Sequence, residues 1–140
     1  MIVLDTNVLS ELMRPKPSPR VAAWIAQQPM AELFTTAITE AEIFYGIALL
    51  TKGKRRDSLL SAAEGMFAED FAERVLAFES DAARHFATIA AHRRALGRPI
   101  SYADAQIAAI ARVHGAKLAT GNGPDFADCG VTVIDPWREP

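Results

Sequence analysis

The amino-acid sequence predicts an α/β protein built on one open, doubly wound parallel sheet. Five short apolar segments, each suited to a buried strand, alternate with stretches of helical periodicity. Strands that are separated by helices pair in parallel, and the helices then cover both faces of the sheet. The length of 140 residues suits a single domain, residues 1–140, that can close its own hydrophobic core.

The expected elements follow one another without a repeat or an interdomain linker. The strands are expected at residues 1–4, 33–36, 75–78, 117–120 and 131–134. The helices are expected at residues 6–13, 19–28, 39–50, 57–67, 80–96 and 101–114, with a basic break at 52–56. Ser18 before Pro19 is typical of a helix start, and Gly97 and Gly115 are typical of helix ends.

Composition and charge exclude several classes of protein. With 50% apolar and 23% charged residues, the chain is unlike a disordered one. Its single cysteine, Cys129, cannot form an internal disulfide. No apolar stretch approaches the ~20 residues that span a bilayer, and Asp5 interrupts the start too early for a signal peptide. We therefore expect a soluble cytoplasmic protein without membrane association. The formal charge of −2 argues against nucleic-acid binding through bulk positive charge.

Acidic residues occupy four places where strands end or helices begin. Asp5 follows the first strand directly, and Asp125 lies in the loop after the fourth. Glu42 and Asp104 each follow a hydroxyl residue by three positions, in the sequences TEAE and SYAD, which predicts that each is the third residue of a helix. Because the carboxyl ends of parallel strands meet at one edge of the sheet, the four carboxylates are expected to converge there.

Each of these acids also has a purely structural interpretation. Glu42 and Asp104 fit the capping-box pattern, and a carboxylate in the first turn of a helix favours the helix dipole. Asp125 fits ordinary turn chemistry, with Asp128 as a nearby competitor for its role. Asp5 is harder to explain in this way, because an unpaired charge beside a buried strand is expensive.

The pattern of metal-binding residue types points to a hard cation. The three histidines and Cys129 have no spacing suited to a zinc site: His85, His92 and His114. An all-oxygen cluster suits Mg²⁺ or Mn²⁺. Such cations orient and ionise a water molecule and stabilise phosphate charge during hydrolysis.

Four segments together resemble the PIN-domain ribonucleases, in particular the VapC-like and FitB-like toxins of toxin–antitoxin pairs. They are MIVLDTNVL at residues 1–9, ITEAEIFYG at 38–46, PISYADAQIAA at 99–109, and LATGN at 118–122 continued through 125–126 to 136–137. The resemblance covers nearly the whole chain in order. It implies a PIN-like domain with a five-stranded parallel sheet flanked by helices, and an Mg²⁺-dependent endoribonuclease for which Mn²⁺ is also suitable.

The resemblance also implies roles for particular residues. Asp5, Glu42 and Asp104 match the catalytic, metal-binding acids, and either Asp125 or Asn122 completes the set. Thr6 and Ser101 match positions that support the site through their hydroxyls. Asn7 matches a position that stabilises the first turn. Thr120 and Asn122 are further supporting residues. The chain departs from the family at Gly121, where an arginine is common, and at Asn122, where an aspartate is also common.

Partners follow from the same resemblance. RNA needs positive surface, for which Arg14, Lys16 and Arg20 are the best candidates. We expect the residues 93, 94 and 98, all arginines, to form an ordinary solvated face. The family implies a cognate antitoxin protein whose tail occupies a groove near the site. It also implies a homodimer that forms a heterotetramer or larger assembly with the antitoxin.

The sequence is also compatible with two rival functions. A haloacid-dehalogenase-like phosphatase also begins with an aspartate after its first strand, but it needs an acid where Asn7 stands. The other alternative is a non-catalytic PIN-like module that binds RNA or a partner protein. Metal-dependent cleavage of RNA would exclude this module, and absence of cleavage would favour it. If the acids hold a cation, its charge reverses the local potential, and the net charge of −2 then says little about nucleic-acid binding.

Overall fold

The computed structural model describes all residues, Met1–Pro140. Five strands form one sheet in the order β3-β2-β1-β4-β5, and every neighbouring pair is parallel. Their bounds are β1 Ile2–Leu4, β2 Leu33–Thr36, β3 Val75–Leu76, β4 Lys117–Ala119 and β5 Val133–Ile134. The predicted five-stranded parallel sheet is thereby confirmed, with β3 and β5 each shorter than expected.

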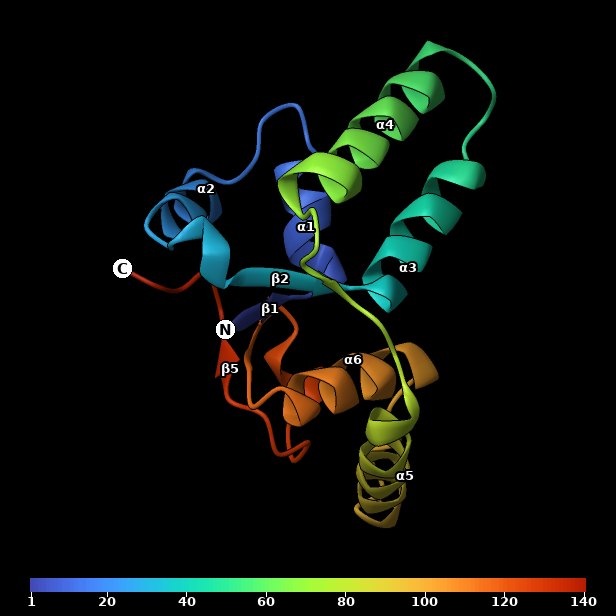
Figure 1. The fold of residues 1–140 in the computed structure, drawn as a ribbon, viewed down its shortest axis with the longest axis vertical. Helices are drawn as coiled ribbons and strands as arrows, with labels where there is room; N and C mark the ends of the chain where they lie inside the picture. Colours follow the sequence, from blue (N-terminus) through green and yellow to red (C-terminus); the bar gives the residue numbers. More distant parts are fainter.

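Six helices cover the two faces of this sheet. They are α1 Thr6–Leu12, α2 Pro19–Ala26, α3 Ala37–Ala48, α4 Lys54–Gly65, α5 Ser80–Ala95 and α6 Tyr102–Val113. Figure 1 shows α1, α3 and α4 on one side of the sheet and α5 and α6 on the other. No helix has the length and apolar character needed to cross a membrane.

The core consists of two apolar clusters, one on each face of the sheet. Val3 and Leu118 belong to the cluster beneath α5 and α6, whereas Leu4 and Ala119 belong to the cluster beneath α1 to α4. The register pairs Val3 with Leu118 and Leu4 with Ala119. Because successive residues along a strand point to opposite faces of the sheet, each of these strands contributes side chains to both clusters. The strands are therefore enclosed on both sides, and polar groups gather at their ends.

The start of α3 differs from the prediction. The helix begins at Ala37, and Thr36 is its N-cap, accepting a hydrogen bond from the Thr39 backbone N–H at 3.1 Å. Glu42 is consequently the sixth helical residue, so the capping-box interpretation of Glu42 is wrong. The reason is that Thr36, in extended conformation at the end of β2, already supplies a capping hydroxyl. In α6 the pattern is as predicted, since Ser101 is the N-cap and Asp104 the third residue.

The start of α4 also differs from the prediction. The helix begins at Lys54, inside the segment expected to be a basic break, directly after Gly53 with its φ of 158°. Lysine and arginine are good helix formers, so the basic run extends the helix toward its N-terminus. At the other end, a π-helical turn at Met66–Asp70 follows α4 directly. Helix α4 packs against α3 on the same face of the sheet as α1 (Figure 1).

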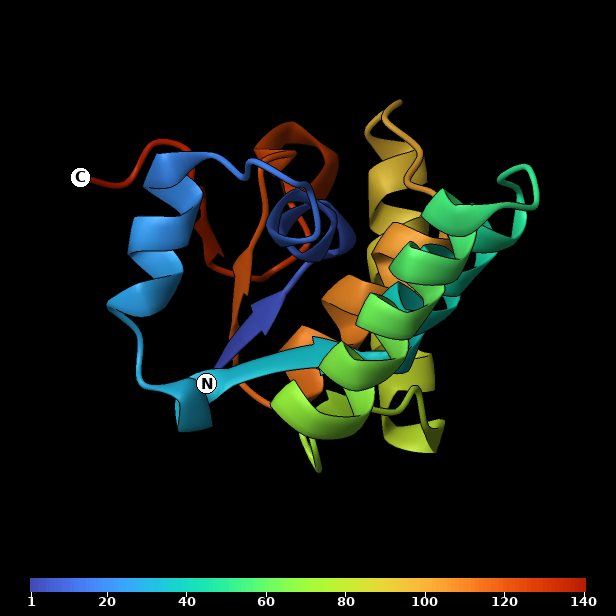
Figure 2. The same ribbon diagram turned by 90° about the horizontal axis from the view of Figure 1, so that it is seen from above.

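The order of the strands creates a switch point between β1 and β4. From β1 the chain adds β2 and then β3 on one side, and later returns to add β4 and β5 on the other side. Figure 2 shows β1 running directly into α1 at this edge of the sheet. In open α/β sheets, ligands bind outside the carboxyl ends of the strands at such a point.

Candidate metal centre

Asp5 stands at the carboxyl end of β1, where the chain turns into α1. It is 4% exposed and is the N-cap of that helix. Its Oδ1 accepts a hydrogen bond from the Thr6 backbone N–H at 2.8 Å. Its Oδ2 accepts from the Thr120 hydroxyl at 2.8 Å and from the Asn7 side-chain amide at 3.2 Å. The protein therefore holds both carboxylate oxygens in place.

Thr120 and Asn7 join the ends of β1 and β4. The Thr120 hydroxyl is fully buried and also accepts hydrogen bonds from the Asn7 amide at 3.1 Å and the Asn122 backbone N–H at 3.0 Å. The Asn7 side-chain oxygen accepts from the Gly121 backbone N–H at 3.2 Å. The loop that follows β4 is thus tied to Asp5 through two side chains.

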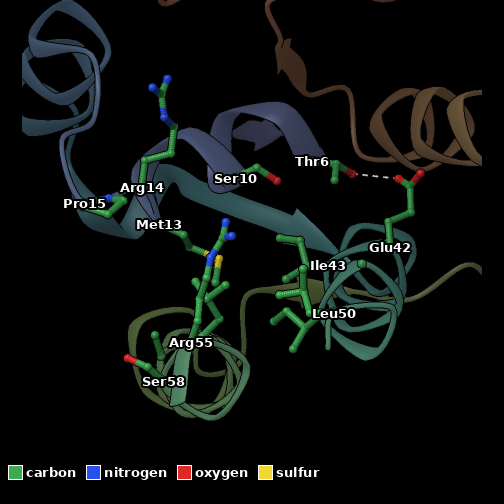
Figure 3. A pocket seen from close by; sticks show the side chains of 14 residues that line it. Thr6, Ser10, Met13, Arg14, Pro15, Glu42, Ile43, Leu50, Arg55 and Ser58 are labelled. Atoms are coloured by element: carbon green, nitrogen blue, oxygen red, sulfur yellow. Dashed lines mark hydrogen bonds between the residues drawn. The ribbon is translucent and has the colours of Figure 1, made fainter. Parts of the chain in front are cut away.

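Glu42 reaches the same edge from the second turn of α3. Its Oε1 accepts a hydrogen bond from the Thr6 hydroxyl at 2.7 Å, and the Thr6 and Thr39 hydroxyl oxygens lie 3.0 Å apart. Figure 3 shows the Thr6–Glu42 hydrogen bond bridging α1 and α3. Thr39 therefore supports the site through Thr6. The sequence indicated only a helix start at Thr39.

Asp104 approaches from the first turn of α6. Its backbone N–H donates to the Ser101 hydroxyl at 3.1 Å, and its side chain is half-buried. The pKa of Asp104 is raised to about 6, first by burial and then by the negative charge of Asp5, while the hydrogen bond with Ser101 opposes the rise. Asp125 and Glu42 raise it further. Charges felt in this way show that the acids of four separate segments share one region.

The pKa of Asp5 is also raised. Burial is the main cause, because it disfavours the charged form of the carboxyl group. The hydrogen bonds from Thr120 and Thr6 oppose this rise, and the charges of Glu42 and Asp125 add to it. Burial and the neighbouring carboxylates thus both disfavour the charged forms of Asp5 and Asp104, and a bound cation would favour them.

A hollow of about 560 Å³ opens between these side chains. Its lining includes Asp5, Glu42, Asp104 and Asn122. Asp125 is exposed and lies outside the lining, in the 3₁₀ turn Gly123–Phe126, although its charge raises the pKa of two of these acids. Of the two candidates for the fourth oxygen ligand, Asn122 lines the hollow and Asp125 does not.

The residues around this hollow fit a hard divalent cation by their chemistry. Asp5, Glu42 and Asp104 offer carboxylate oxygens and Asn122 an amide oxygen, whereas the fourth acid of the lining, Glu11, is paired with Arg14. Neither histidine nor cysteine lines the hollow. As the side chains stand, no three acidic, histidine or cysteine side chains lie close enough together to ligate one ion. Carboxylates repel one another at such a site, and a cation would draw them inward.

Two of the three expected RNA-binding residues have partners within the chain. Arg14 forms an ion pair with the buried Glu11, with 3.1 Å between Nη1 and Oε1. Arg20 donates from Nη1 to the Trp137 backbone oxygen at 3.2 Å. Lys16 is exposed on the loop between α1 and α2. Arg14 lines the hollow at the acids, which keeps it the best placed of the three basic residues.

Arg93 is not part of a solvated face, contrary to the expectation for residues 93, 94 and 98. It is 5% exposed, and its guanidinium donates to the backbone oxygens of Arg98 at 2.7 Å, Asp125 at 2.6 Å and Ala127 at 3.1 Å. It therefore holds the loop after β4 against α5. The helical spacing contained a usable signal, since Arg93 follows the buried Ile89 by four residues.

Gly121 and Trp137 form a contact that the sequence did not reveal. A Cβ atom on residue 121 would lie 2.8 Å from Cζ3 of Trp137, closer than side chains approach one another. The indole thus occupies the space beside residue 121. Trp137 also lines the hollow that contains the acids.

A second hollow of about 650 Å³ adjoins the first, between α1, α3 and α4. Four residues line both hollows: Thr6, Ser10, Arg14 and Glu42. The rest of its lining is largely apolar, with Ile43 of α3 on one side, and Arg55 projects from α4 toward it (Figure 3).

Comparisons with known proteins agree with this geometry. The family profile described as PIN domain matches residues 2–130. VapC ribonuclease Y4jK of Sinorhizobium fredii is 42% identical over 138 residues, which cover 99% of each chain. Toxin FitB of Neisseria gonorrhoeae is 38% identical over 139 residues, covering 99% of this chain and 100% of that protein.

Solved structures give the same result. The crystal structure of FitAcB from Neisseria gonorrhoeae matches with a TM-score of 0.92 at 38% identity, over 99% of this chain and 100% of that one. The structure of FitAB bound to an IR36 DNA fragment also matches with a TM-score of 0.92, over 100% of this chain and 98% of that one. This chain therefore belongs to the PIN-domain family, with VapC-like and FitB-like proteins as its relatives.

Proposed function

We propose that this protein is an Mg²⁺-dependent endoribonuclease, the toxin of a toxin–antitoxin pair in the cytoplasm, and that residues 1–140 act as one domain. The observation that carries the proposal is the convergence of Asp5, Glu42 and Asp104 on one hollow at the switch point of the sheet. Relatives at 42% and 38% identity over the whole chain are named a VapC ribonuclease and a toxin, which supports the same conclusion.

Asp5 and Asp104 would ligate the cation directly, and Glu42 would bind it or its water molecules. Asn122 could complete the set through its amide oxygen, with Asp125 as the alternative. When bound, Mg²⁺ or Mn²⁺ would ionise a water molecule and stabilise negative charge on the phosphate. The Asp104 carboxyl, with its pKa of about 6, is mostly ionised at neutral pH and so available to a cation.

The surrounding residues orient these ligands. Thr120, Asn7 and the Thr6 backbone N–H fix Asp5, and the Thr6 hydroxyl fixes Glu42. These hydrogen bonds restrict the orientations of the Asp5 and Glu42 carboxylates, which limits the rearrangement needed when a cation draws the acids together. Arg14 stands at the same hollow, where a guanidinium can contact a phosphate.

An antitoxin protein is the proposed partner. The matching structures are of FitAcB and of FitAB with a DNA fragment, which supports assembly of this chain with an antitoxin as a homodimer in a heterotetramer or larger complex. The largely apolar hollow between α1, α3 and α4 shares four lining residues with the acidic hollow: Thr6, Ser10, Arg14 and Glu42. A peptide seated there would cover the acids and block access of RNA.

Cleavage of RNA by the purified protein tests the activity. We expect cleavage with Mg²⁺ or Mn²⁺, none with EDTA, and at least a hundredfold loss, about 3 kcal/mol of barrier, in Asp104→Asn. Asp128→Asn is the matched control, because Asp128 lies in the same region of sequence as Asp125, pairs with Arg98 and does not line the hollow. Protein that is inert with both cations, or an Asp104→Asn variant as active as the native chain, would contradict the proposal.

A non-catalytic RNA- or partner-binding module is the second candidate. The observation in its favour is that Asn122, and not a fourth free carboxylate, stands beside Asp5, Glu42 and Asp104 in the lining, since the remaining acid there, Glu11, is paired with Arg14. The same assay separates the two functions, because a binding module would retain RNA with Mg²⁺ present and leave it intact.

A further inference from the structure

Trp137 stands at the hollow that holds the acids, although it comes from the far end of the chain. It lines this hollow together with Asp5, Asp104 and Asn122, and it is only partly buried. We propose that its indole is a stacking platform for a nucleobase of single-stranded RNA, next to the phosphate that the acids and their cation would engage. This inference rests on the proposed function, since it names how the substrate would be held.

The indole is held in place before any ligand arrives. Its six-membered ring lies against the bare Cα of Gly121, where a Cβ would be 2.8 Å from Cζ3 and 2.9 Å from Cε3. The Trp137 backbone N–H donates to Asp135 Oδ1 at 2.9 Å, and its backbone oxygen accepts from Arg20 at 3.2 Å. A rigid aromatic surface loses little conformational entropy on binding, so it is suited to recognition.

Core packing alone does not account for this placement. The other tryptophan, Trp24, is 6% exposed and belongs to the apolar cluster on the α1–α4 face. Trp137 packs against the margin of that cluster and also borders a hollow whose remaining lining is almost entirely polar. An aromatic ring with one side on the core and another on a polar hollow is typical of a binding surface.

The lining of the hollow matches the parts of a nucleotide. The carboxylates and their cation suit a phosphate, the Arg14 guanidinium suits a second phosphate, and the Trp137 indole suits a base. The volume of about 560 Å³ lies within the ~300–1,000 Å³ range of small-molecule sites. Stacking on an aromatic ring accepts every base, so Trp137 would add affinity with little sequence preference.

Binding measurements with and without bases test the inference. All variants carry Asp104→Asn to prevent cleavage, and Mg²⁺ is present. The two probes are a short oligoadenylate and an oligomer of the same length built of tetrahydrofuran phosphates, which has no bases. We expect Trp137→Ala to weaken oligoadenylate binding by about 5- to 140-fold, the equivalent of ~1–3 kcal/mol per stacked base, and Trp137→Phe to weaken it less. Binding of the baseless oligomer should stay unchanged.

Tryptophan fluorescence gives a second readout. In Trp24→Phe, Trp137 is the only tryptophan, and oligoadenylate should quench its emission. In Trp137→Phe, the remaining Trp24 is buried, and the quenching should disappear.

The outcomes separate this inference from the proposed function. Equal loss of both probes in Trp137→Ala would assign Trp137 a purely structural role and overturn the inference, as would unchanged or undetectable oligoadenylate binding. Cleavage by the native chain judges the proposed function independently. Base-dependent binding through Trp137 in a chain that cleaves nothing would keep the stacking platform and remove the nuclease.

Discussion

Neutralising Asp104 should stabilise the metal-free protein. Burial and the charges of Asp5, Asp125 and Glu42 raise the pKa of Asp104 from its ordinary 3.8 to about 6. In the folded state the carboxyl group therefore keeps its proton to a higher pH than it does in the unfolded chain. Its contribution to stability is fully present below the unfolded pKa and is lost as the pH rises through about 6. At neutral pH the charged group destabilises the folded protein, and Asp104→Asn removes that charge.

The size of the effect follows from the rise in pKa. A change from 3.8 to about 6 corresponds to about 3 kcal/mol, at ~1.36 kcal/mol for each pH unit. Asp104 is only half-buried, and solvent screens its interactions, so about 1–2 kcal/mol is the reasonable expectation. For a chain of this length, ~1 kcal/mol moves the melting temperature by about 4 °C. Asp104→Asn should thus melt about 4–8 °C above the native chain.

Thermal unfolding followed by circular dichroism measures this change. In EDTA at about pH 7.5 we expect the full gain, and at about pH 4.5, where Asp104 is protonated in the folded native chain, most of it should vanish. Saturating Mg²⁺ should reverse the order, because the native chain binds the cation more tightly; a concentration of ~100 Kd adds about 2.7 kcal/mol to its stability.

Glu64→Gln is the matched control, since Glu64 is an exposed carboxylate on α4 with no ion-pair partner. An Asp104→Asn variant that melts at or below the native temperature in EDTA at neutral pH would refute the reasoning. So would a gain of the same size in the control, because the effect would then not depend on the acidic hollow.

Three further predictions concern the supports of the site. Thr120→Val removes the hydroxyl that donates to Asp5. We expect the free energy of unfolding, measured in urea, to fall by about 1–3 kcal/mol, and Mn²⁺ binding, measured by calorimetry, to weaken. Thr120→Ser should retain both the stability and the Mn²⁺ binding. Arg93→Ala leaves three backbone oxygens without their donor and should lower the free energy of unfolding by about 3 kcal/mol or more. Arg93→Lys should restore stability only partly, because an ammonium group lacks the guanidinium fork. Equal stability of Arg93→Ala and the native chain would contradict this. Gly121→Ala should displace the indole, lower the melting temperature and shift the Trp137 emission. The loss of stability caused by Gly121→Ala should be smaller in a chain that already carries Trp137→Ala. Additive losses of stability in the double variant would disprove the contact.

Much of the fold could be predicted because it depends on local patterns. Short apolar strands alternating with amphipathic helices specify a parallel sheet covered on both faces, and the strand order β3-β2-β1-β4-β5 agrees with this. Ser18 and Ser101 were predicted as N-caps because a capping hydroxyl acts within three residues of its own position. The error at α3 arose because two threonines, Thr36 and Thr39, satisfy the same local rule.

The convergence of the acids could be predicted only in outline. Asp5 directly follows a buried strand, and parallel topology brings strand ends together, so a shared edge was the natural expectation. Local patterns could not distinguish Asn122 from Asp125, because both lie in one irregular loop after β4. In the structure Asn122, whose backbone N–H donates to the Thr120 hydroxyl, lines the hollow, and Asp125 does not.

The sequence by itself therefore determined the class of fold, the order of its elements and the acidic residues at the carboxyl ends of the strands, because these depend on periodicity, capping and chain direction. Only the tertiary structure decided the contacts that make a site of them. Thr120 binds Asp5 across 115 positions of sequence, and Arg93 binds the loop of Asp125 across 32. The indole of Trp137 lies on Gly121 because β5 returns beside β4. Such contacts depend on how whole elements pack, and a local pattern holds no record of them.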